Sequence, residues 1–189
     1  MDLTFKPLTR DQWHDFTALF GENGACGGCW CMYWRLTRKV FTAQKGEGNR
    51  QAMKAIVESG NIPGLLAYHS AEPVGWCSVG PRDTYPVLSR SRILKPVDDK
   101  PCWSVSCLFI HKLHRKKGVA TALLEAAVAY AGAKGAGILE GYPVEPKSGK
   151  NIPPAFAWTG IPSAFEKAGF KEVLRRSPTR PIMRIKLKP

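Results

Sequence analysis

Alternation of apolar and polar side chains is clearest in the middle of the chain, at residues 103–110. This run is rich in β-branched and aromatic residues, which is typical of a strand. Directly after it, apolar residues repeat at helical spacing over residues 119–130, among many alanines that favour a helix. A basic turn joins the two segments. The pattern therefore predicts a strand, a turn and a helix that begins at Gly118.

Weaker patterns predict the elements before this central unit. We expect a first strand at residues 3–7, a helix capped by Thr9 and ended by Gly21, and a second helix at residues 49–59. A hairpin is expected next, with strands at residues 65–69 and 74–79. Residues 80–100 are rich in proline, glycine and charge, so we expect a long loop there.

The remaining elements follow the central helix. We expect a strand at residues 138–144, a loop at 145–159, a short helix that begins at Ile161 or Pro162 and ends at Gly169, and two final strands. In the last strand, alternation places Met183, Ile185 and Leu187 inward and Arg184, Lys186 and Lys188 toward water. Hairpins followed by one strand–helix–strand crossover predict an α+β (mixed α/β) fold with helices on both faces of the sheet.

The charge at the start of the central helix is unusual. A helix N-terminus carries partial positive charge, so acidic residues are favoured there. Here Arg115, Lys116 and Lys117 occupy that place, and no acid occurs between Asp99 and Glu125. Cations, free backbone N–H groups and a glycine together predict an anion site, most simply for a phosphate. The chain has neither the G-x-G-x-x-G of a dinucleotide fold nor a P-loop motif.

These residues resemble a known family. Arg115-Lys116-Lys117-Gly118-Val119-Ala120 is similar to the R/Q-x-x-G-x-G/A signature of the GNAT N-acetyltransferase superfamily, in its strand-to-helix setting. Phe165-Glu166-Lys167-Ala168-Gly169-Phe170 resembles that family's late helix with its terminal Gly-Phe. The resemblance covers about residues 5–187. It implies one GNAT-like domain over residues 1–189, with a central, mostly antiparallel twisted sheet of about seven strands.

The resemblance also implies a co-substrate, acetyl-coenzyme A, whose acetyl group passes to an amine by direct attack in a ternary complex. The helix N-terminus would hold the pyrophosphate, the pantetheine arm would pair with the central strand, and an N–H near Leu108 would stabilise the oxyanion. The residues expected to bind the cofactor are Leu108, Phe109, Ile110, Arg115, Lys116, Lys117, Gly118, Val119, Ala120, Thr121 and Phe165. The alternative is a catalytically weak acyl-coenzyme A sensor or regulatory module of the same fold.

Two features depart from what the resemblance implies for catalysis. Many relatives have a carboxylate on the central strand as general base, but this strand has only Ser104 and Ser106. Glu140 is the best substitute, with a surface salt bridge as its structural alternative, and Glu145 and His111 are weaker candidates. The family often has a tyrosine as general acid where this chain has Phe165. Tyr142 or a cysteine is the expected replacement.

A cluster of cysteines and aromatic residues precedes the second helix. Cys26, Cys29 and Cys31 lie close together, but they lack the spaced ligand pairs of a zinc site and the following helix of a redox C-x-x-C motif. Two interpretations of this segment remain: a packed hydrophobic loop, or the wall of a substrate pocket. In the resembled family this segment covers the acceptor, which implies that Cys29, Cys31, Tyr33 and Trp34 line its site. Arg82 would meet an acidic acceptor group or be a surface arginine.

Composition and charge limit the classes of ligand and partner that we expect. The 189 residues carry a net charge of +13, which favours anionic ligands. Basic residues gather at one helix start and in the C-terminal hairpin, without interleaved aromatic residues, so we expect no specific nucleic-acid partner. Without a secretory signal or a long apolar run, we expect a cytoplasmic protein with cysteine thiols, no membrane span and no metal. The expected acceptor is a small-molecule or peptide amine, and a homodimer is compatible with the sequence.

Overall fold

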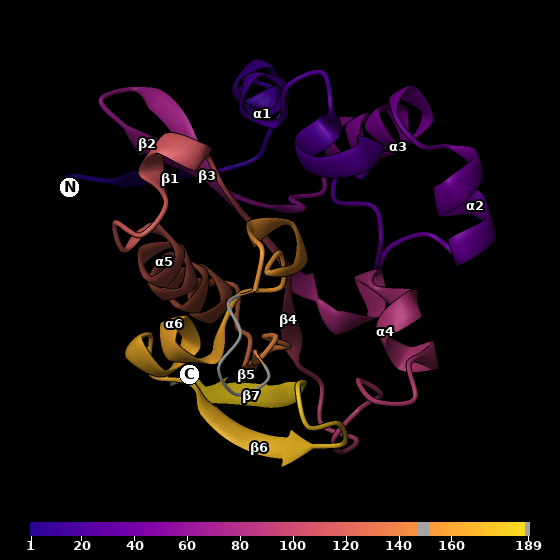
Figure 1. Ribbon diagram of the computed structural model, residues 1–189, viewed down its shortest axis with the longest axis vertical. Helices are drawn as coiled ribbons and strands as arrows, with labels where there is room; N and C mark the ends of the chain where they lie inside the picture. The colour runs from indigo at the N-terminus through magenta and orange to yellow at the C-terminus, as the bar shows by residue number, and fades with distance from the viewer. Residues whose placement is uncertain (147–151, 188–189) are drawn as a thin grey trace.

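The computed structural model describes residues 1–146 and 152–187 of the chain. Seven strands form one sheet in the order β1-β2-β3-β4-β5-β7-β6, with helices on both faces (Figure 1). Neighbouring strands are antiparallel except β4 and β5, which are parallel. The mixed, mostly antiparallel sheet expected from the sequence is therefore confirmed. The strands are β1 (Thr4–Pro7), β2 (Gly64–His69), β3 (Glu72–Pro81), β4 (Trp103–Ile110), β5 (Ile138–Gly141), β6 (Lys171–Arg175) and β7 (Pro181–Lys186).

Helices cover the sheet in two groups, which lie on opposite sides of it in Figure 1. The helices are α1 (Trp13–Phe20), α2 (Arg38–Ala43), α3 (Glu47–Glu58), α4 (Pro86–Arg90), α5 (Val119–Ala133) and α6 (Pro162–Lys167). Apolar side chains of α5 and α6 pack on one face, around Val105, Leu108 and Leu123. On the other face α1 and α3 pack around Trp76, and α4 packs beside them around Tyr85.

The strand β4 changes its facing pattern at a bulge. Ser78 pairs with Cys107, whereas the next residue of β3, Val79, pairs with Val105, so Ser106 is the extra residue. Val105 packs with the α5 side of the core, whereas Cys107 packs with the α1 side. The bulge thus keeps both faces apolar and turns the Cys107 side chain toward α1.

Several expected boundaries were wrong. The first helix begins at Trp13 rather than after Thr9, and β5 ends at Gly141 rather than at residue 144. The expected long loop contains α4 and a 3-10 turn, Arg82–Thr84, while α2 was not expected at all. Further short turns lie at Gly24–Gly28, Lys112–His114 and Pro154–Phe156. None of the helices within the two described ranges is long and apolar enough to span a bilayer.

The last strand confirms the inward placement of Met183, which is buried. Arg184, however, does not face water: its side chain is only 9% exposed and forms two ion pairs. Alternation identified the strand but not the buried carboxylate that holds this arginine. Lys188, also expected to face water, lies outside the described residues.

Candidate active site

The turn between β4 and α5 has an unusual backbone. Lys116 has a φ of 59° and Gly118, directly before α5, has a φ of 82°. This left-handed region suits glycine, because other residues strain there. A Cβ on Gly118 would meet nothing within 4 Å, so glycine is required by the backbone angle and not by crowding. The space beside the helix start is open.

Three amides at the start of α5 point along the helix axis. Within the described ranges, no backbone or side-chain acceptor is bonded to the N–H groups of Val119, Ala120 or Thr121. The first turn of α5 contains no acidic residue, and the cations of Arg115, Lys116 and Lys117 are exposed around it. Free amides, the positive end of the helix dipole and nearby cations together suit an anionic ligand.

The side chain of Arg115 ties this turn to β4. Its Nε donates to the carbonyl oxygen of Ile110, at 3.0 Å. Ile110 is the last residue of β4, so the anion site and the edge of the strand are held together.

The parallel strands β4 and β5 separate beyond their first three paired residues. Pairing ends at Val105 and Gly141. Further on, Leu108 N–H donates to the carbonyl oxygen of Trp158 at 2.6 Å, and Val144 N–H donates to that of Gly160 at 2.9 Å. Residues 158–160 therefore bridge the gap between the strands. The free N–H expected near Leu108 is bonded within the protein, because the loop after β5 returns to this gap.

Comparison with known proteins bears on this arrangement of strand, basic turn and helix. The sequence model of the acetyltransferase (GNAT) family matches residues 30–144, which is more than half of the chain and includes this whole unit. The chain belongs to the GNAT acetyltransferase family. The family expected from the sequence is thus confirmed. A comparison with curated proteins gave no significant match.

Solved GNAT structures share the fold at low sequence identity. The chain is similar to the PaiA N-acetyltransferase of Thermoplasma acidophilum in complex with coenzyme A, with 15% identity, a TM-score of 0.55 and coverage of 98% of this chain and 99% of that one. An N-acetyltransferase of Staphylococcus aureus Mu50 gives 12% identity, a TM-score of 0.56 and full coverage of both chains. The NatC complex bound to Gag peptide and coenzyme A gives 11% identity, a TM-score of 0.54 and full coverage. At these identities the similarity establishes the fold alone.

Glu140, the expected base of this GNAT chain, lies at the centre of a buried polar network. It is fully buried, and its Oε1 accepts from Arg82 Nη1 at 2.6 Å and from the Tyr142 hydroxyl at 2.6 Å. Its Oε2 accepts from Arg184 Nε at 2.6 Å. Both oxygens are therefore bonded, and the salt bridge expected at the surface is in fact buried. The sequence gives no sign of this network, because its members come from distant segments.

The other members of the network are bonded on several sides. Arg82 is buried, so the surface position considered for it from the sequence is wrong. Its guanidinium also donates to the Tyr142 hydroxyl and to the Leu94 carbonyl. Tyr142 is fully buried and shares a 2.8 Å hydrogen bond with Ser104. Burial, followed by the charge of Glu140, raises the pKa of Tyr142 well above its usual value. Tyr142 therefore stays protonated at neutral pH.

The weaker base candidates lie apart from this network. Glu145 is ion-paired with Arg175 near the molecular surface. His111 is half-buried at the end of β4, with its ring 6.0 Å from that of His114.

Phe165 is fully buried where the family often has a tyrosine. A Cβ added to Gly141 would overlap its ring, and one added to Gly160 would lie 2.7 Å from it. Phe165 therefore fills the space left by two glycines, one at the end of β5 and one in the bridging segment.

The cysteine-rich loop packs on the α1 face of the sheet. Cys31 and Trp34 are buried, and Cys29 and Tyr33 are half-buried, so the four residues expected to line the acceptor site lie in one segment. Tyr33 and Trp34 contact the ring of Trp158, with centroids 5.2 and 5.8 Å away. Trp158 thus links the expected acceptor loop to Leu108. Sequence reasoning missed it, since one aromatic residue in a proline-containing loop is a weak signal.

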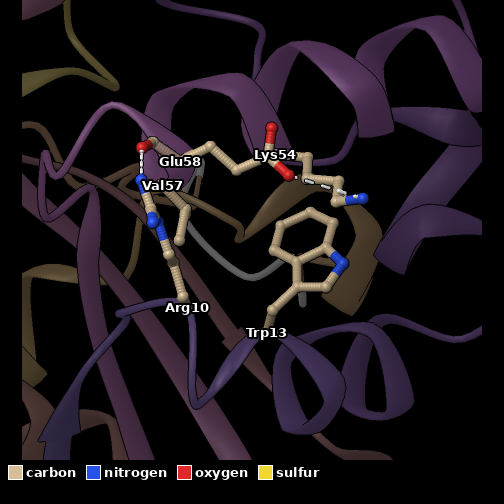
Figure 2. Close-up of a pocket in the computed structure, with 5 residues that line it drawn as sticks. All are labelled: Arg10, Trp13, Lys54, Val57 and Glu58. Atoms are coloured by element: carbon tan, nitrogen blue, oxygen red, sulfur yellow. Dashed lines mark hydrogen bonds and ion pairs between the residues drawn. The ribbon is translucent and has the colours of Figure 1, made fainter.

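The described residues also form two hollows. One, of about 410 Å³, lies between α1 and α3 (Figure 2). Its polar side chains are bonded locally: Arg10 to the Glu58 carbonyl, and Lys54 to the Glu58 carboxylate at 3.5 Å. The other, of about 740 Å³, is lined by Trp103 and Tyr130 at the opposite end of β4 from the basic turn. In the part of the chain that the structure describes, no three His, Cys, Asp or Glu side chains are placed to hold a metal ion.

Proposed function

We propose that this chain transfers an acetyl group from acetyl-coenzyme A to the nitrogen of an amine. The observation that carries the proposal is the open anion site of free amides and cations at the start of α5, joined to the edge of β4. The family match and the coenzyme A bound in two structural neighbours support it.

The pyrophosphate would lie against the amides of Val119, Ala120 and Thr121, with Arg115, Lys116 and Lys117 around it. The open space at Gly118 fits such a group, because nothing within 4 Å competes for it. The pantetheine arm would then follow the β5-facing edge of residues 108–110. Leu108 N–H points to this edge, and alternation along the strand directs Ile110 N–H the same way.

The Leu108 amide is the proposed oxyanion donor. As the amine nitrogen bonds to the thioester carbon, negative charge develops on the carbonyl oxygen, and one such N–H contributes roughly 3 kcal/mol to the transition state. Trp158 holds this donor in the structure, so its carbonyl must release Leu108 for the thioester oxygen to bind. Segment 158–160 then becomes part of the acceptor side of the site.

The acceptor amine has to lose a proton, because an alkyl amine with a pKa of about 10 is mostly protonated at neutral pH. The contacts of Glu140 favour a structural role over that of a base, since both of its oxygens already accept hydrogen bonds from arginines. The hydroxyl of Tyr142 is likewise hydrogen-bonded, to Arg82, Ser104 and Glu140, so a structural role is favoured for it too. The thiol of coenzyme A needs no strong acid, because a thiolate with a pKa of about 8.5 leaves readily. Water at the half-buried acceptor loop is the proposed proton carrier.

A sensor that binds acyl-coenzyme A without turnover is the second candidate. The bond between Leu108 N–H and the Trp158 carbonyl favours it, since the proposed oxyanion donor is covered. Release of free thiol from acetyl-coenzyme A in the presence of a panel of amines separates the two. Tight cofactor binding without turnover for every amine would support the sensor.

Calorimetry with coenzyme A tests the anion site itself. The double variant Arg115→Glu/Lys117→Glu is expected to lose at least about tenfold in affinity, equivalent to roughly 1.4 kcal/mol. The control is Lys171→Glu/Lys186→Glu, which makes the same charge change at two exposed residues of the C-terminal hairpin. Equal losses in both variants would mean that only net charge matters, and the site would be refuted.

A further inference from the structure

A half-buried arginine is bonded to the segment that bridges the gap between β4 and β5. Arg180 directly precedes β7, and its Nη1 donates to Thr159 Oγ1 at 2.8 Å and to the Tyr142 carbonyl oxygen at 3.4 Å. Thr159 and Tyr142 are buried, so they fix one end of the guanidinium. Trp158, the neighbour of Thr159, covers the N–H of Leu108 with its carbonyl oxygen. Arg180 is therefore joined to the acceptor side of the proposed site.

One edge of the Arg180 guanidinium is free to bind a ligand. Among the described residues, its Nε and Nη2 have no hydrogen-bond partner, and no carboxylate forms an ion pair with it. Both nitrogens keep solvent-accessible surface, whereas the unbonded Nε atoms of Arg35 and Arg82 are buried. The N–H groups of Nε and Nη2 on this edge are parallel, so they can bind the two oxygens of one carboxylate.

The same hairpin contains an example of this bidentate contact. Arg175, the last residue of β6, donates from Nε and Nη2 to the two carboxylate oxygens of Glu172, at 2.8 and 2.6 Å. Arg180 offers the same two donors, but no acidic residue of the described chain receives them. A carboxylate from outside the chain would complete the contact.

Other buried or half-buried arginines of the described chain are compensated in ways that Arg180 is not. Three form ion pairs with carboxylates: Arg50, Arg82 and Arg184. Arg176 donates to three backbone carbonyls, and Arg35 lies over the Tyr85 ring, 4.4 Å from its centroid. Burial lowers the pKa of Arg180 below its usual value, because it removes water from a charge that no carboxylate balances. A bound carboxylate would offset this cost.

We propose that Arg180 binds a carboxylate of the acceptor, and that the acceptor is a free amino acid. The inference rests on the proposed function, which requires an amine at the same site. The amine nitrogen bonds to the thioester carbon beside Leu108, the C–S bond breaks, and the proton lost by nitrogen passes through water to the departing thiolate. Arg180 holds the carboxylate throughout and takes no part in these bond changes. It is a specificity-determining residue.

The short connection between Arg180 and Leu108 favours a small acceptor over a peptide. The two residues are bonded to adjacent residues of the bridging segment, Thr159 and Trp158. An amine at one and a carboxylate at the other must therefore belong to one short molecule. In a peptide, the C-terminal carboxylate lies further from the N-terminal amine.

The test compares each common L-amino acid with its own carboxamide, which keeps the amine and the side chain but lacks the negative charge. Release of coenzyme A from acetyl-coenzyme A gives KM and kcat for both members of each pair. For the amino acid that is turned over best, KM is expected to be at least about tenfold lower than for its amide, with kcat changed less. The amine of the amide is less basic, so reactivity alone would give the opposite preference. Equal KM values within every pair would overturn the proposal.

Variants test whether Arg180 itself recognises the carboxylate. Arg180→Met should abolish the preference for acid over amide, and Arg180→Lys, which keeps the charge but not the paired donors, should weaken it. If Arg180 only held the bridging segment in place, both ligands would be affected equally and the preference would remain. The control Lys186→Met removes one exposed charge from β7 and should keep the preference. Its loss in the control as well would refute the assignment to Arg180.

Calorimetry with the same acid and amide pairs, on the full chain saturated with coenzyme A, separates this inference from the proposed function. If amino acids bind more tightly than their amides and Arg180→Met removes the difference, but no amine is acetylated, the carboxylate site stands and the transferase fails. If amines are acetylated equally with and without a carboxylate, the transferase stands and the role of Arg180 is refuted. Absence of binding for every amino acid would also refute it. The wild-type comparison does not depend on a variant that folds.

Discussion

Arg82 and Glu140 form an ion pair of 2.6 Å in which the carboxylate is completely buried. The pair joins the segment after β3 to β5, and Arg184 of β7 binds the second carboxylate oxygen at 2.6 Å. Charges removed from water in this way are stable only while every partner remains. The residue expected to be a base is thus an internal counter-ion for two arginines.

Replacement of Glu140 by Gln should therefore lower stability strongly. The variant leaves Arg82 and Arg184 without their buried counter-charge, and removal of one partner of such a pair costs about 3–5 kcal/mol. Urea unfolding measures the free energy of unfolding. Glu145→Gln is the control, because its ion pair with Arg175 lies near the surface and is worth at most about 1 kcal/mol. Equal, small losses in the two variants would contradict the structural role of Glu140.

The close fit of Phe165 against Gly141 makes a second prediction. A Cβ at residue 141 would overlap the Phe165 ring, so Gly141→Ala should destabilise by about 1–3 kcal/mol. Adding Phe165→Leu should recover part of the loss, because the smaller side chain makes room. Gly132→Ala, in α5 with nothing within 4 Å, is the control and should stabilise by up to about 1 kcal/mol. Thermal and urea unfolding would check all three; no loss in Gly141→Ala would show that Phe165 can move aside.

Sequence patterns identified the parts of the fold that repeat regularly. The boundaries of β4 were predicted correctly, and α5 begins at Val119, one residue after the predicted start at Gly118. The missed helices, α2 and α4, have six and five residues, too few to show a helical period. Alternation alone also could not locate the bulge at Ser106.

The site was only partly predictable for a different reason. The basic turn at residues 115–118 is continuous in sequence, so its charge and its glycine were visible directly. The contacts of Glu140 with Arg82 and Arg184 join segments 58 and 44 residues away, and no local pattern encodes such pairs. For the same reason Arg184 was wrongly expected to face water. The bond from Leu108 to Trp158 likewise depends on how a long loop returns to the sheet.

Gly118 provides a third prediction, on the backbone of the anion site. At a φ of 82°, alanine costs about 1–2 kcal/mol, whereas asparagine tolerates this region better. We expect both stability and coenzyme A affinity to fall in the order Gly, Asn, Ala. Gly137→Ala, which has open space and no positive φ, should change neither. Calorimetry and unfolding measure the two quantities. Alanine performing as well as glycine would show that the left-handed turn is not needed for binding.

Trp158 supplies the last prediction, since its ring holds the segment whose carbonyl covers Leu108 N–H. Trp158→Ala keeps the carbonyl but removes ring contacts with Tyr33 and Trp34, each worth about 0.5–1.5 kcal/mol. If the cofactor arm must displace this segment, the variant should bind coenzyme A about two- to tenfold more tightly, the range to which such energies correspond. Adenosine 3′-phosphate 5′-diphosphate, which lacks the arm, should bind unchanged.

The control for Trp158 is Trp103→Ala, which truncates the same ring at the far end of β4, where it packs on Tyr130. This variant should lower the free energy of unfolding without changing the affinity for coenzyme A relative to that for adenosine 3′-phosphate 5′-diphosphate. Weaker binding of coenzyme A alone to Trp158→Ala would show that the ring forms a wall for the cofactor arm. Weaker binding of both ligands would show that the segment supports the anion site. Only a selective gain for the full cofactor agrees with Trp158 and the thioester competing for the same backbone N–H.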